Sequence, residues 1–99
     1  MPKIYQYLGF LFFFYSNEHL PIHCHVKRGE HEVKAELEYI NGKPIVKFLK
    51  IKGSKIFNKK DLNEIEKFIK SHDSGIVEKW TNFFIYGKRP KFEMIKQKK

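Results

Sequence analysis

The fold class is decided by residues 22–51, which read IHCHVKRGEHEVKAELEYINGKPIVKFLKI. Apolar and polar residues alternate over 22–27 and again over 32–39. Such alternation is typical of a strand with one buried and one solvated face. The Asn-Gly pair at 41–42 is a strong signal for a two-residue hairpin turn, and residues 45–51 return as its partner strand. This stretch therefore predicts an antiparallel sheet.

Upstream lies the longest apolar run of the chain, residues 8–15. Because it is apolar at nearly every position, we expect one strand buried on both faces, with a bulge or bend at Gly9. The run is far shorter than the roughly 20 residues that a membrane-spanning helix needs. No small-residue cleavage site follows it, so we also expect no signal peptide. The sequence predicts a soluble, cytoplasmic protein with no membrane partner.

The spacing of apolar residues changes from strand-like to helical in the second half of the chain. Asn58 can cap a helix, with Asp61 three residues later. One apolar face at helical spacing follows, made by Leu62, Ile65, Phe68, Ile69 and His72. A second such face comprises Ile76, Val77, Trp80, Phe83 and Phe84, and Gly87 ends it. We predict an α+β fold, with a mostly antiparallel sheet or meander in the N-terminal half and two C-terminal helices packed on one face.

Length and charge limit the organisation and the function classes. The 99 residues suit a single α+β domain over 1–87, followed by a basic, flexible tail over 88–99. The net charge is +9, yet only Arg28 and Arg89 among the 20 basic residues are arginines, so the charge alone does not indicate phosphate recognition. The single cysteine excludes a disulfide framework and a cysteine-only zinc site.

The candidate site is a group of three histidines in the pattern His-x-Pro-x-His-x-His. His23 and His25 lie two residues apart on a predicted strand, so both project from the face opposite the apolar one, and His19 can fold back over them. Three imidazoles could hold a divalent metal such as zinc with one coordination position open. Glu18 or Glu30 would then orient an imidazole. No other cofactor is expected.

Two further interpretations of the same histidines stay open. They could act as general acid and base on RNA or another phosphate-bearing target, with Lys27 and Arg28 binding the substrate. They could also form a solvated pair on an exposed strand face. On every interpretation Cys24 points into the core.

At this cluster the chain resembles a known family. The stretch EHLPIHCHV (18–26), the opening MPKI (1–4), Gly9 and Trp80 are similar to the bacterial family called domain of unknown function 4160, over roughly residues 1–85. The family pattern has Asp, Pro and Phe where this chain has Glu18, Ile22 and Cys24. The three histidines are kept in place.

The resemblance implies little about activity, because the family has no settled one. Its members are often encoded beside another small protein, and the pair has been proposed as a toxin–antitoxin module. The chain would then be the candidate toxin, acting on RNA or another phosphate-bearing target, or its partner-binding half. The alternative is a non-enzymatic interaction module, whose histidines are structural or bind a metal. A small cognate protein, RNA and a second copy of the chain are the partners these hypotheses name.

Overall fold

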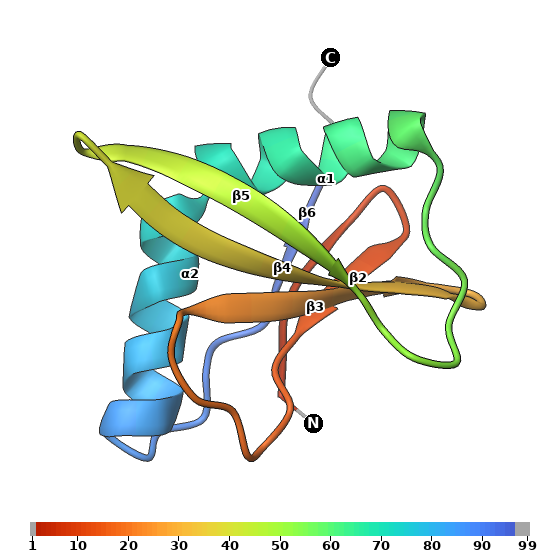
Figure 1. The fold of residues 1–99 in the computed structure, drawn as a ribbon. Coiled ribbons are helices and arrows are strands. Elements are labelled where there is room, and N and C mark those ends of the chain that lie inside the picture. Colours follow the sequence, from red (N-terminus) through yellow and green to blue (C-terminus); the bar gives the residue numbers. More distant parts are fainter. Residues whose placement is uncertain (1, 97–99) are drawn as a thin grey trace.

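The computed structural model describes residues 2–96, which form one six-stranded sheet with two helices on one face (Figure 1). The strands follow the spatial order β5-β4-β3-β2-β1-β6, and only β1 and β6 pair in parallel. Their bounds are β1 Lys3–Tyr7, β2 Phe10–Phe13, β3 His23–Arg28, β4 His31–Ile40, β5 Lys43–Lys50 and β6 Glu93–Ile95. The helices are α1 Lys59–Ser71 and α2 Asp73–Trp80, and the π-helical turn η1 Thr81–Ile85 follows α2 directly. The predicted α+β fold is confirmed.

The hydrophobic core lies between the helices and the face of the sheet that alternation predicts. Registered pairs such as Cys24 with Ala35 and Val26 with Val33 place their side chains on this same face. Cys24 is buried there, as expected. The helices contribute Ile65, Phe68, Ile69, Ile76 and Trp80 to the same cluster. Among the helices of residues 2–96, none combines the length and apolar character needed to cross a bilayer.

The apolar run over 8–15 is not one strand, which corrects the expectation from sequence. Leu8 and Gly9 have φ angles of 52° and 79°, so they form a two-residue turn between β1 and β2. Two successive residues in the left-handed region give the twist that antiparallel strands require. The run therefore divides into a turn, the strand β2, and the start of the connection from β2 to β3, residues 14–22.

The turn and helix-capping residues predicted for the later part of the chain are confirmed. Asn41 and Gly42 both have positive φ and join β4 to β5. The Asn58 side chain accepts a hydrogen bond from the Asp61 amide at the start of α1. Gly87 follows η1 with a φ of 66°.

The segment expected to be a flexible tail, residues 88–99, carries the strand β6. It pairs in parallel with β1, whose outer edge would otherwise be open. A side-chain contact reinforces the pairing, because the buried Lys79 Nζ donates to Glu93 Oε1 at 2.7 Å. The last part of the expected tail, residues 97–99, lies outside the described residues.

Candidate metal centre

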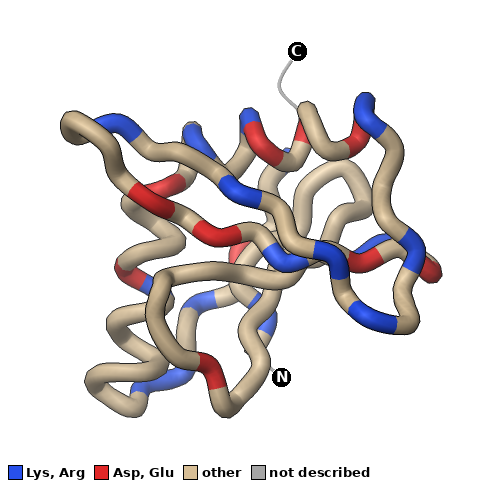
Figure 2. The backbone as a smooth tube through the Cα atoms, viewed as in Figure 1, with Lys and Arg blue, Asp and Glu red and all other residues tan. Residues whose placement is uncertain are grey.

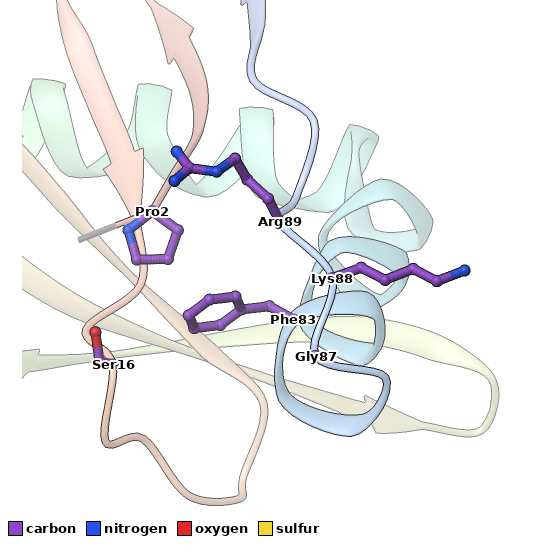
Figure 3. Close-up of a pocket in the computed structure, with 6 residues that line it drawn as sticks. All are labelled: Pro2, Ser16, Phe83, Gly87, Lys88 and Arg89. Carbon is purple, nitrogen blue, oxygen red and sulfur yellow. The ribbon is translucent and has the colours of Figure 1, made fainter.

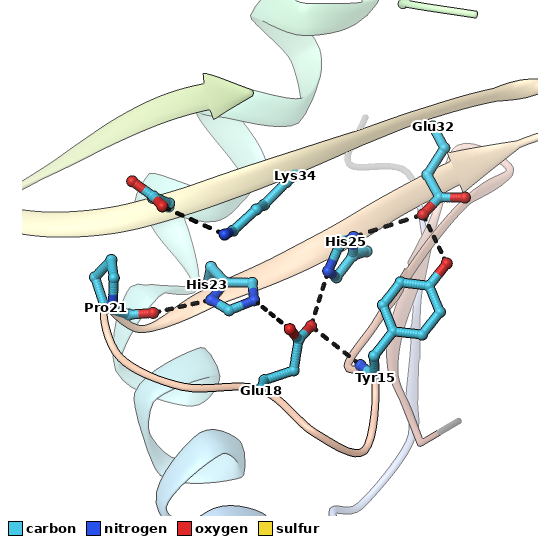
Figure 4. A network of polar contacts seen from close by, with 8 residues as sticks. Tyr15, Glu18, Pro21, His23, His25, Glu32 and Lys34 are labelled. Carbon is cyan, nitrogen blue, oxygen red and sulfur yellow. Dashed lines mark hydrogen bonds and ion pairs between the residues drawn. The ribbon is translucent and has the colours of Figure 1, made fainter. Parts of the chain in front are cut away.

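The connection between β2 and β3 passes over the polar face of the sheet and brings Glu18 to the two strand histidines (Figure 4). His23 and His25 do project from the face opposite the core. They are nevertheless 2% and 5% exposed, so the interpretation as a solvated pair is wrong. Alternation predicts which face a side chain takes, but it does not predict what covers that face.

Aromatic rings cover the two imidazoles on their open sides. Phe13 stacks on His25 with ring centroids 5.6 Å apart, and Tyr15 meets the same imidazole edge-on at 4.4 Å. Trp80 lies 5.1 Å from the His23 ring. These rings leave each imidazole little freedom to rotate, because close packing holds a side chain in one rotamer.

Glu18 joins the two histidines through their Nε2 atoms. Its Oε1 lies 2.8 Å from His25 Nε2, and its Oε2 lies 2.9 Å from His23 Nε2. One potential ligand atom from each of the three residues falls within 4.8 Å of the others. A carboxylate and two imidazole nitrogens gathered this closely are a donor set that zinc and other transition metals accept.

The hydrogen bond made by His23 Nδ1 shows which tautomer a neutral His23 ring adopts. Nδ1 lies 2.9 Å from the Pro21 carbonyl oxygen, which can only accept, so Nδ1 carries a proton and donates it. In a neutral ring Nε2 then has a lone pair facing the Glu18 carboxylate. Nε2 is buried and forms no hydrogen bond within residues 2–96. Two acceptors at 2.9 Å need a positive charge between them, either a proton on Nε2 or a metal ion.

His25 is backed by a second carboxylate. Its Nδ1 lies 3.5 Å from Glu32 Oε2 and, like His23 Nε2, forms no hydrogen bond within residues 2–96. The same Glu32 oxygen accepts the Tyr15 hydroxyl at 2.9 Å. Burial and the carboxylate of Glu32 raise the pKa of Tyr15 to about 12, so this hydroxyl stays a donor. A carboxylate behind a histidine is the arrangement that orients an imidazole toward a metal.

The protonation tendencies of the site follow from burial and from the contacts. Burial lowers the pKa of His25, although the Glu18 carboxylate partly opposes the effect. Burial alone would raise the pKa of Glu18, but its contacts with His23, with the Tyr15 amide and with His25 outweigh it and lower that pKa. A neutral imidazole and an ionised carboxylate are the forms that bind metals.

The remaining residues singled out from sequence lie elsewhere. His19 is exposed and does not belong to the group of potential ligand atoms. Lys27 is exposed at the far end of β3. Arg28 covers the Phe10 ring on the helix side of the sheet and pairs with Asp61 of α1. The structure therefore does not bring Arg28 to the histidines.

The acidic residues have different roles from those expected. Glu18 supplies a potential ligand, whereas the sequence suggested only an orienting role. Glu30 pairs with Lys55 at 3.6 Å, and Glu32 is the carboxylate behind His25. A signal for Glu18 was present, because the family pattern also has a carboxylate at this position. Glu32 carried no such signal, since only the pairing of β3 with β4 places it there.

Comparison with known proteins gives one match. The sequence model of a family described as Domain of unknown function (DUF4160) matches residues 9–81, which include the whole cluster. No curated protein and no solved structure matches the chain. Since the match covers well over half of the sequence, the chain belongs to the DUF4160 family.

Proposed function

We propose that the protein binds one divalent transition-metal ion, with zinc as the first candidate, through Glu18, His23 and His25. One observation carries the proposal: both rings present Nε2 to the same carboxylate, while each Nδ1 faces an oxygen acceptor. The Pro21 carbonyl fixes the His23 ring so that, when neutral, its Nε2 lone pair faces Glu18. The His25 Nδ1 forms no hydrogen bond within residues 2–96, and its Nε2 is hydrogen-bonded to the same carboxylate, where a metal ion would replace the shared proton. Three protein ligands leave at least one coordination position for water or another donor.

The burial of the site favours metal binding over direct acid–base catalysis on RNA. A general base must come within hydrogen-bond reach of the proton it removes. Here both rings are nearly inaccessible, and Arg28 is engaged on the other face of the sheet. The cluster instead ties the connection over 14–22 to β3, which suits the alternative of an interaction module that binds a metal. A bound ion would hold that connection in place.

The toxin–antitoxin hypothesis and action on RNA still follow from the family resemblance. Induced expression of the native chain, with growth as the readout, tests them. If the protein is a toxin whose action needs the metal, the native chain arrests growth and Glu18→Gln does not. Arrest by both proteins would separate toxicity from the metal centre.

A zinc titration of protein without an affinity tag tests the metal proposal. The chain is freed of metal with a chelator and titrated against a chromophoric zinc indicator. We expect one equivalent per native chain. The variants Glu18→Gln and His23→Ala lower the affinity by roughly tenfold or more, because each removes a ligand.

His19→Ala is the matched control, because it removes an exposed imidazole from the same connection. It should bind zinc like the native chain. Circular dichroism establishes that each variant is folded. Equal affinity of the native chain and Glu18→Gln would overturn the proposal, as would failure of the native chain to take up zinc, cobalt(II), nickel(II) or iron(II).

A further inference from the structure

A basic and aromatic surface is formed by the start of β1 together with η1 and the segment that joins η1 to β6. It consists of two adjoining depressions of about 340 and 400 Å³ that share Pro2 and Arg89. Phe83 lines the first depression (Figure 3) and Phe92 the second. Each depression thus has one aromatic ring, and the arginine is common to both. We call Pro2, Lys3, Phe83, Arg89 and Phe92 the Arg89 surface.

The cations of this surface are unpaired within residues 2–96. Lys3 and Arg89 form no ion pair there, and no carboxylate lines either depression. Arg28 and Lys79, by contrast, each have a carboxylate partner. Figure 2 shows basic and acidic positions interspersed along α1, whereas residues 86–92 include basic ones only.

The backbone and the Phe83 ring are held in place. The Lys88 amide donates to the Asn82 carbonyl at 2.8 Å, and Pro90 is buried on the other side of Arg89. Phe83 packs edge-on against Phe84 with ring centroids 4.7 Å apart. Figure 3 shows the Arg89 side chain extending toward Pro2, while Lys88 points away from the depression. The backbone beside Arg89 and the Phe83 ring are therefore set before any ligand arrives, and the exposed Arg89 side chain reaches over Pro2 from this fixed segment.

We propose that the Arg89 surface binds single-stranded nucleic acid. A free guanidinium pairs with a phosphate in a bidentate manner, and aromatic rings stack on bases without regard to sequence. The order of ring, arginine and ring fits one phosphate on Arg89, with the flanking bases on Phe83 and Phe92. The net charge of +9 would also attract an acidic protein, but a pair of rings flanking the arginine favours nucleobases. No residue of this surface belongs to the metal centre.

Fluorescence anisotropy with a labelled ten-nucleotide oligouridine, measured over a range of salt concentrations, tests the proposal on the full chain. Arg89→Gln should weaken binding about fivefold or more and reduce the slope of log affinity against log salt by about 0.7. Phe92→Ala should weaken binding about fivefold and leave that slope unchanged, because it removes stacking and not charge. Phe83→Leu keeps most of the apolar volume but removes the aromatic ring. It should therefore also weaken binding about fivefold and leave the salt slope unchanged.

Lys47→Gln is the charge-matched control. It makes the same charge change on the exposed β5, which lies at the opposite edge of the sheet from β6. Its affinity should stay within about twofold of the native chain. Circular dichroism and thermal melting check that every variant is folded.

Three outcomes would overturn the proposal. The first is an equal loss of affinity in Lys47→Gln and Arg89→Gln, which would mean diffuse charge attraction. The second is full affinity in both phenylalanine variants. The third is that polyglutamate or uridine monophosphate competes as well as the unlabelled oligouridine does.

Discussion

Leu8 holds a backbone conformation that its side chain disfavours. Its φ is 52°, and a leucine in the left-handed region costs about 1 kcal/mol or more. Asparagine tolerates this region, and Asn-Gly is the preferred pair for a turn of this kind. The side chain is 37% exposed, so it buries less apolar surface than a core leucine does, and its replacement costs less stability.

We therefore expect Leu8→Asn to raise the free energy of unfolding by about 0.5 kcal/mol. Urea denaturation measures the change. Leu8→Ala is the control, since it also removes the apolar contacts of the leucine but does not favour positive φ. If both variants lose stability equally, the strain at Leu8 is negligible and packing of its side chain dominates.

The strand β6 depends on a charge pair as well as on its three residues. Lys79 is buried, and its ammonium donates to the Glu93 carboxylate across the junction with α2. This hydrogen bond holds the pKa of Glu93 below its ordinary value, although burial opposes the shift. The unfolded chain therefore takes up the proton at higher pH than the folded chain does.

It follows that the pair stabilises the fold above the unfolded pKa of Glu93, and that this stability is lost as pH falls through the lower, folded pKa. Glu93→Gln should be less stable than the native chain near pH 7, and the difference should shrink between about pH 5 and pH 3. Urea unfolding at several pH values measures it. Glu38→Gln changes an exposed position of β4, and the difference between its free energy of unfolding and that of the native chain should stay constant over this pH range. A constant difference for Glu93→Gln would contradict this account.

The elements that could be predicted from sequence are those set by local signals. Alternation over 22–27 gave the correct faces of β3, and the Asn-Gly pair at 41–42 gave the hairpin. Asn58 gave the start of α1. Each signal depends on neighbours within a few residues, so no knowledge of the tertiary path was needed.

The elements that could not be predicted depend on distant parts of the chain. Nothing local to 93–95 shows that β1 offers a free edge for pairing. Likewise, the path of 14–22 decides that Glu18, and not the adjacent His19, reaches β3. The two-residue repeat of a strand predicted that His23 and His25 share one face. It predicted neither the burial of that face nor Glu18 as the third potential ligand.

For the molecule as a whole, metal binding should appear as thermal stability. A ligand that binds only the folded state at 100 times its dissociation constant adds about 2.7 kcal/mol. For a domain of this size that corresponds to a rise in Tm of roughly 10–20 °C. Differential scanning calorimetry of the native chain with zinc and with chelator measures the rise. Glu18→Gln should show none of it, and an equal rise in that variant would place zinc at another position.

Trp80 gives this protein an optical reporter of its own. It is the only tryptophan of the chain, and its indole lies beside the His23 imidazole at the edge of the core. Indole emission responds to the charge and the motion of groups in contact with the ring. We therefore expect the intrinsic fluorescence of the unlabelled protein to change when the proposed metal binds at His23, and rapid mixing with metal or chelator would then give the rates of binding and release.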